Sequence, residues 1–254
     1  MKFKRLIPAL AMLLVSAILL GTSTFAWFSM NTTVTASSMQ IKATTDANLY
    51  IAKGASVALD AITGTSVDDL SVAVAAVKPA DMQASGGTVT VKAAKTFTTA
   101  PTVSTAGSAS TYDDIGTVTV SAANDATGFD IDDYAAVAFV SIARKQDVAQ
   151  TYKLTPTCTV SLPQVSGQDS NLNKSLRAGL IINGAFYESN DANTASGTAT
   201  FTFSDVTGLA DNTAYSAALL LWFEGEDSDC FVNNAIILSN NTAEWSFTSA
   251  TTNA

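Results

Sequence analysis

Two short runs of acidic residues are the side chains of this sequence best placed to do chemistry. The runs are Glu224, Glu226, Asp227 and Asp229, and Asp130, Asp132 and Asp133. Paired carboxylates carry out glycoside hydrolysis, and grouped carboxylates bind calcium. Acidic runs at strand ends are far more often solvated turns. We therefore keep the first run as a candidate calcium site, expect no other metal or cofactor, and predict that the protein is not an enzyme.

The absence of histidine supports that prediction. The chain has 0 His among its 254 residues, which excludes Ser-His-Asp and Cys-His nucleophiles, the HExxH metalloprotease helix and a histidine general base. Two cysteines without a histidine cannot build a closed zinc site of the usual kind. We accordingly expect no catalytic and no cofactor-binding residues.

The two cysteines leave two alternatives open. Cys158 lies on the apolar face of a predicted strand, and Cys230 follows an acidic loop. In an exported chain they could form one disulfide. Both could equally stay buried thiols, because nothing in the sequence shows that they meet.

The N-terminus reads as a signal peptide of residues 1–26. A positively charged start precedes an apolar run from Leu6 to Leu20, and Thr24-Phe25-Ala26 offers a cleavage site after Ala26. Cleavage by a signal peptidase would leave Trp27 as the first residue. The alternative is an uncleaved anchor, because an apolar segment extended through Phe28 would be long enough to span a membrane. The polar residues 21–24 favour cleavage.

The net negative charge of the chain restricts the classes of molecule that it can bind. The leader holds three of the 13 Lys and Arg, so the remaining chain has 10 of them against 22 Asp and Glu, a net charge of −12. Binding of nucleic acid needs a basic face. We expect a secreted or cell-surface protein that binds no nucleic acid and contacts a membrane only through its leader.

The composition and the apolar periodicity predict an all-β fold. The chain is rich in Ala, Thr, Ser and Val and only 14% charged, as is typical of β-rich extracellular proteins. Period-2 alternation predicts strands within residues 28–36, 39–43, 48–52, 88–93, 116–122, 154–162, 198–204, 215–224, 235–239 and 244–248. Residues 134–143 are wholly apolar and predict a central strand buried on both faces. About a dozen strands suit a two-sheet sandwich or jelly roll.

Turn and cap signals add detail to this jelly-roll-like β-sandwich. Asn183-Gly184 between two apolar runs fits a type I′ hairpin turn. Ser66 to Asp69 resembles a capping box, and the helical spacing of apolar residues up to Val77 predicts a short helix that ends before Pro79. Besides the signal helix we expect at most one or two such short helices. Residues 96–110 predict a flexible loop, either inserted within one sandwich or separating two small domains.

Two segments resemble known exported proteins. AWFSMNTTVTASSMQIKA, residues 26–43, is similar to the start of the TasA and camelysin group of Gram-positive bacteria, in which a hydrophobic leader ends at an Ala followed by an aromatic residue. A strand resembling T-A-S-x-x-x-[IL] follows, here residues 35–41. ALLLWFEGEDSDCFVNNA, residues 218–235, is similar to a W-[IF]-E-G-x-D-x-D-C segment of uncharacterised surface proteins.

The resemblance implies a secreted jelly-roll subunit of an extracellular biofilm-matrix fibre. In such a fibre the N-terminal segment inserts as a donor strand into the next subunit, which makes a homo-oligomeric filament. Camelysins are linked with proteolysis, but the absence of histidine counts against that activity in this chain. The implied organisation is a signal peptide at residues 1–26, a donor-type strand segment at 27–43 and a β-sandwich domain at 44–254.

The residues themselves support this arrangement but leave alternatives open. The expected subunit contacts are Trp27, Phe28, Met30 and Val34, and the last three lie on one face of a strand that could complete a neighbour's sheet. Such a head-to-tail contact does not close on itself and would propagate. The segment could instead be an ordinary edge strand within its own domain. The runner-up function is a surface adhesin or carbohydrate-binding module.

Overall fold

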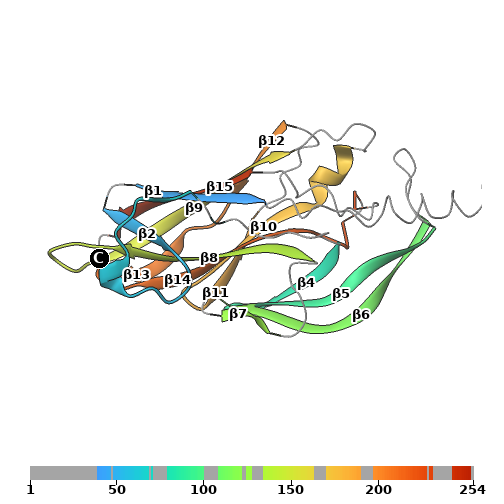
Figure 1. Cartoon of the computed structure of the whole chain (residues 1–254), viewed down its shortest axis with the longest axis horizontal. Helices are drawn as coiled ribbons and strands as arrows, with labels where there is room; N and C mark the ends of the chain where they lie inside the picture. The colour runs from blue at the N-terminus through green and yellow to red at the C-terminus, as the bar shows by residue number, and fades with distance from the viewer. Residues whose placement is uncertain are drawn as a thin grey trace, which may run out of the picture. The chain divides into compact units, whose positions relative to one another are not determined.

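We describe the protein from a computed structural model (Figure 1). The structure describes residues 39–46, 48–68, 70, 79–99, 108–121, 124–127, 134–162, 170–189, 197–227, 229–230 and 242–252. All of them belong to one compact unit, Ala36–Ala254. The predicted signal peptide and the strand predicted at residues 28–36 lie outside the described residues, as does the strand predicted at 235–239.

The first sheet has six strands. Its order is β12 (Gly197–Thr202), β9 (Thr151–Leu162), β15 (Thr242–Thr251), β1 (Gln40–Thr45) and β3 (Ser66–Val67), and β13 (Val206–Ala210) also pairs with β9. The strands β12 and β13 take opposite halves of the same side of β9, because β15 occupies the other side. The pairing of β1 with β15 is parallel and runs from Gln40↔Thr242 to Thr45↔Phe247.

The second sheet has five strands and faces the first. Its order is β11 (Ala185–Glu188), β10 (Leu176–Ile182), β14 (Tyr215–Phe223), β8 (Ala135–Arg144) and β2 (Leu49–Lys53). Alternate residues of both sheets point into one continuous core, which includes Ile41 of β1, Val160 of β9, Leu180 of β10 and Leu219 of β14. The all-β sandwich predicted from the sequence is therefore confirmed.

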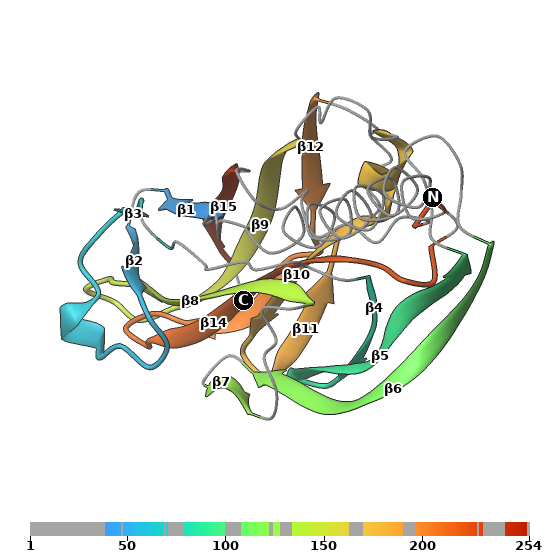
Figure 2. The same ribbon diagram turned by 45° about the vertical axis from the view of Figure 1, so that its right-hand side comes forward.

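A third sheet covers the other face of the second sheet (Figure 2). It consists of β4 (Ala80–Ser85), β5 (Thr88–Thr99), β6 (Ser108–Ser121) and β7 (Asn124–Thr127). Val89 and Val91 of β5 pack on Ile181, Leu220 and Trp222 in a second apolar cluster. The prediction of two sheets omitted this layer. It is required because β14 is apolar on both faces, so its outer face also needs cover.

Several local predictions are confirmed by the register and the backbone angles. Asn183 and Gly184 have φ angles of 51° and 71°, as a type I′ turn requires, and Ile182 pairs with Ala185 across it. β8 is buried along nearly its whole length, as expected of a central strand. In β9 the even-numbered residues are buried and most odd-numbered ones are half-buried.

Two local predictions are wrong where the structure describes them. Ser66 and Val67 do not begin a helix but form β3, which pairs with Ala43 and Thr44 of β1; residues 71–78 lie outside the described part. The loop predicted at 96–110 is strand at both ends, because β5 and β6 pair as far as Thr99↔Ser108. Backbone pairing and the β propensity of threonine favour the extension of this hairpin. The described helices are two short 3₁₀ turns, Leu59–Ala61 and Ser170–Ser175.

Candidate functional site

The acidic run that follows β14 forms turns in which the carboxylates of Glu224 and Asp227 have partners within the chain. Oε2 of Glu224 accepts a hydrogen bond from Nε1 of Trp222 at 3.2 Å, and Oε1 accepts one from the Glu226 backbone N–H at 3.3 Å. Oδ1 of Asp227 accepts from the Asp229 N–H at 2.8 Å. The backbone oxygen of Asp227 accepts from the Cys230 N–H at 3.0 Å. These bonds turn the chain back toward the core.

Arg177 of β10 forms an ion pair with one acid of this turn. Its guanidinium donates to Oδ2 of Asp227 at 2.6 Å and to the carbonyl oxygen of Lys174 at 2.8 Å. The side chains of Arg177 and Asp227 are only 9% and 14% exposed. The ion pair therefore holds the loop after β14 against the start of β10.

The four candidate calcium ligands do not form a site in the described part of the chain. Among those residues no three Asp, Glu, Cys or His side chains are grouped closely enough to hold a metal ion. Asp227 is used by Arg177, and Glu224 points to Trp222. The second acidic run, Asp130, Asp132 and Asp133, lies outside the described residues.

Glu224 lies in an environment that disfavours its ionised carboxylate. Its backbone forms a parallel bridge with Ala80 at the start of β4, so it lies where the third sheet meets the second. Burial raises the pKa of Glu224, and the charge of Asp81 raises it further, against the opposing hydrogen bond from Trp222. The ionised form of this carboxylate is therefore disfavoured in the folded protein.

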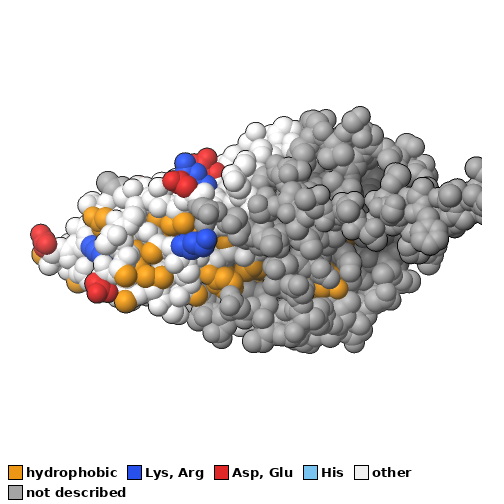
Figure 3. Space-filling model, viewed as in Figure 1, with side chains coloured by type: hydrophobic (Ala, Val, Ile, Leu, Met, Phe, Trp, Pro, Cys, Tyr) orange, Lys and Arg blue, Asp and Glu red, His pale blue; other side chains and the backbone are white. Residues whose placement is uncertain are grey.

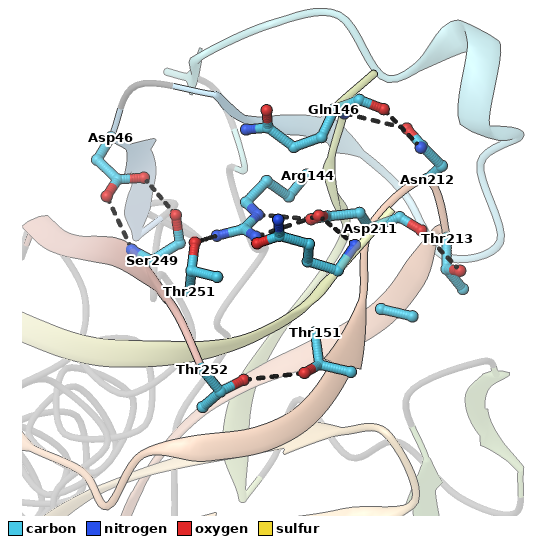
Figure 4. A network of polar contacts seen from close by, with 12 residues as sticks. Asp46, Arg144, Gln146, Thr151, Asp211, Asn212, Thr213, Ser249, Thr251 and Thr252 are labelled. Carbon is cyan, nitrogen blue, oxygen red and sulfur yellow. Dashed lines mark hydrogen bonds and ion pairs between the residues drawn. The ribbon is translucent and has the colours of Figure 1, made fainter. Parts of the chain in front are cut away.

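A second polar cluster lies at the other end of the sandwich, where β1, β8, β13 and β15 all end (Figure 4). Arg144 of β8 donates from Nε and one terminal nitrogen to the two oxygens of Asp211, at 2.5 and 3.2 Å. Both side chains are buried, at 6% and 0% exposure. The other terminal nitrogen donates to Oγ1 of Thr251 on β15 at 3.3 Å. One guanidinium thus connects the second sheet with β15 of the first sheet and with the turn that follows β13.

Further contacts extend this cluster to the loops around it. The Gln150 N–H donates to Oδ2 of Asp211 at 2.9 Å, and the Ser249 N–H donates to Oδ2 of Asp46 at 2.8 Å. The guanidinium of Arg144 also lies 4.6 Å from the ring centroid of Tyr152. We call the set of Arg144, Asp211, Gln150, Thr251, Asp46 and Ser249 the end clamp. The Arg144 hydrogen bond is the main cause that lowers the pKa of Asp211, so the acid stays ionised.

The contacts of the end clamp are those of a structural network. A carboxylate with a lowered pKa that is saturated by a guanidinium is a poor general acid, base or nucleophile. The network was not predicted from the sequence. The only available signal was a charged residue, Arg144, at the end of an otherwise apolar run.

The cysteines lie in the core of the sandwich. Cys158 and Cys230 are both buried there, and the structure contains both as thiols. Burial raises the pKa of Cys158 well above its usual value, which suppresses the reactive thiolate. The predicted subunit contacts, Trp27, Phe28, Met30 and Val34, lie outside the described residues. Trp222 and Trp245 belong to the buried core, with exposures of 1% and 0%.

On the face shown in Figure 3, the described part carries a few scattered acidic and basic side chains among apolar and uncharged ones. Within the described ranges, no helix is long and apolar enough to cross a membrane.

Comparison with known proteins places the chain in no family. No family model matches the sequence, and no curated protein matches it either. Among solved structures, it is similar to AvmM, described as catalysing macrocyclization in alchivemycin A biosynthesis, with 9% identity and a TM-score of 0.24. That match covers 47% of this chain and 82% of AvmM, and its low TM-score supports no conclusion about fold or activity.

Proposed function

We propose that this protein is a secreted structural subunit that assembles into an extracellular fibre by exchanging its N-terminal strand between subunits. The observation that supports this most is the position of β1. Gln40 pairs with Thr242, the first residue of β15, so β1 begins beside the start of β15.

From Met39 onward, the described residues form a continuous core between the two sheets, with Met39, Ile41 and Ala43 fully buried. We propose that the alternating segment that ends at Ala36 inserts into another subunit. Its apolar residues Phe28, Met30 and Val34 would each contribute about 1.5–3 kcal/mol when buried.

The polar clusters described above are consistent with a structural role. The ion pairs Arg144–Asp211 and Arg177–Asp227 join strands of the sandwich to one another or to a loop. The runner-up, a carbohydrate-binding module, needs exposed aromatic rings that stack on sugars. Of the tryptophans in the described chain, both Trp222 and Trp245 are buried.

The first prediction tests the strand exchange directly. Replacement of Phe28, Met30 and Val34 together by Ser should abolish filaments of the secreted protein while leaving a folded, soluble protein. Electron microscopy and sedimentation measure assembly, and thermal unfolding measures stability.

A matched control alters the other face of the same segment. Replacement of Ser29, Asn31 and Thr33 by Ala keeps the apolar face and should leave filament formation intact. An intrachain strand would give the reverse result: the unaltered protein would form no filaments, and the Ser variant would lose much of its stability. That outcome would refute the proposal.

A further inference from the structure

The edges of the three sheets differ in how well they are protected against pairing with another chain. An unpaired edge strand presents free backbone donors and acceptors, and proteins usually block such edges with charges, prolines, bulges, short strands or a covering segment. Most edges in the described part of this chain carry such a device. β12 does not.

The protected edges can be compared one by one. β13 contains an irregularity between Val206 and Leu209 that includes Gly208 at a φ of 76°. β3 has two residues, and β2 is covered by a bridge from Ile51 to Gly64. The edges of the third sheet contain the acidic Asp81 in β4 and only four residues in β7. β11 is also four residues long and ends in Glu188.

β12, by contrast, is a regular six-residue strand at the outside of the first sheet (Figures 1 and 2). Its sequence, GTATFT, has no charge and no proline. It pairs with β9 without a register shift from Gly197↔Leu162 to Thr202↔Thr157. Within the described residues, β9 is the sole strand that pairs with it. Thr198, Thr200 and Thr202 are exposed on its outer face, while Ala199 and Phe201 point into the core.

We propose that β12 pairs antiparallel with β12 of a second copy of this chain and joins their first sheets into one. The sequence is self-complementary about Thr200. With Thr200 opposite its own copy, Thr198 faces Thr202, and Ala199 faces Phe201 on the core side. Each threonine therefore meets a threonine, which is a favourable cross-strand pair, and each small core residue meets a large one.

Charge favours this edge as the meeting point of two copies. The chain carries 22 Asp and Glu against 13 Lys and Arg, so two copies repel each other over much of their surface. The uncharged strand β12 lets two backbones approach without like charges opposite each other. The contact is isologous and closes as a dimer. It is therefore independent of the head-to-tail strand exchange proposed above.

The test uses charge exchange at the two-fold axis. Thr200→Lys and Thr200→Glu each place like charges opposite each other in the dimer, whereas Thr200→Val keeps a β-branched, uncharged side chain. In the chain with Ser at positions 28, 30 and 34, which forms no filaments, sedimentation equilibrium should show a dimer both with Thr200 unchanged and with Thr200→Val. Each charged variant should have a dimer Kd raised at least about tenfold, which corresponds to 1.4 kcal/mol. An equimolar mixture of the Lys and Glu variants should form a heterodimer.

The Ser substitutions at positions 28, 30 and 34 separate this contact from filament formation. Thr200 is exposed, so thermal unfolding should show all three Thr200 variants to be folded. A monomeric chain with Thr200 unchanged, or charged variants that dimerise as well as Thr200→Val, would overturn the proposal. If the charged variants instead lose filaments when Phe28, Met30 and Val34 are intact, and their mixture does not recover a dimer, β12 receives the N-terminal strand of a neighbour, and the self-pairing is refuted.

Discussion

Arg144 and Asp211 are two buried charges in a β-sandwich. The contribution of each to the stability of the fold depends on the presence of the other. Removing two charges from water is costly, and the cost is offset only when geometry and additional hydrogen bonds are good. Here the guanidinium makes two bonds to the carboxylate, and the Gln150 N–H supplies a further donor. The pair is therefore tolerated as a unit, but neither member is tolerated alone.

Loss of one member should be severe. We expect Asp211→Asn to lower the free energy of unfolding by about 3–5 kcal/mol at pH 7, because Arg144 would remain buried without a counter-ion. The double variant Arg144→Met with Asp211→Asn should recover much of that loss, since Asn can still accept from Gln150. Urea unfolding of the three proteins measures both effects.

The pH dependence of the same pair has a defined sign. The pKa of Asp211 is lowered in the folded protein, so its contribution is complete above the unfolded pKa of about 3.9 and is lost as the pH falls through the folded value. The stability difference between the unaltered protein and Asp211→Asn should therefore shrink below about pH 4. A difference that is equal at pH 3 and pH 7 would contradict this account.

Glu224 should behave in the opposite way. Its pKa is raised in the folded protein, so folding becomes less favourable as the pH rises from the unfolded pKa through the folded one. We expect Glu224→Gln to raise the Tm at pH 7 by about 2–4 °C, the change that about 1 kcal/mol produces in a domain of this size. At pH 4 the gain should largely vanish. Glu226→Gln, at the exposed neighbour, is the control and should leave the Tm unchanged.

At the scale of elements, Gly179 determines how β10 and β11 pack under the third sheet. A Cβ atom at this position would lie 2.6 Å from Cε2 of Phe186 and 2.9 Å from Cζ3 of Trp222. These rings belong to the second apolar cluster or pack against it. The glycine is thus required by close approach of two rings and not by its backbone angles.

We expect Gly179→Ala to cost about 1–3 kcal/mol, the usual effect of overpacking a core. Adding Phe186→Leu should restore part of this loss, because the closest clashing atom belongs to the Phe186 ring. Thermal unfolding of the single and double variants measures the recovery. Equal stability of Gly179→Ala and the unaltered protein would show that the rings move aside without cost.

The strands were predictable where one face is buried and the other is not. Val89 and Val91 in β5, and Cys158 and Val160 in β9, follow the period of two and are buried as expected. The misassigned helix at Ser66 shows the limit of local signals. A capping-box pattern was overridden by pairing of Ser66 and Val67 with β1, more than 20 residues away, which a local pattern cannot show.

At the scale of the whole molecule, the number of sheets was harder to predict than the fold class. Alternation reveals which residues are buried but not which layer buries them. The run of apolar residues in β14 signals burial on both faces, yet the covering strands β4 and β5 lie more than 100 residues earlier in the chain. The end clamp was unpredictable for the same reason, because Arg144 and Asp211 are 67 residues apart.

The parallel pairing of β1 with β15 also determines when this protein can fold. Asp46 and Ser249, which close the ladder, are 203 residues apart in the chain, and contacts of such long range slow folding because a large loop must be closed first. During synthesis β1 leaves the ribosome long before its partner β15 has been made. The first sheet therefore stays incomplete until the residues that separate these two strands have all been added.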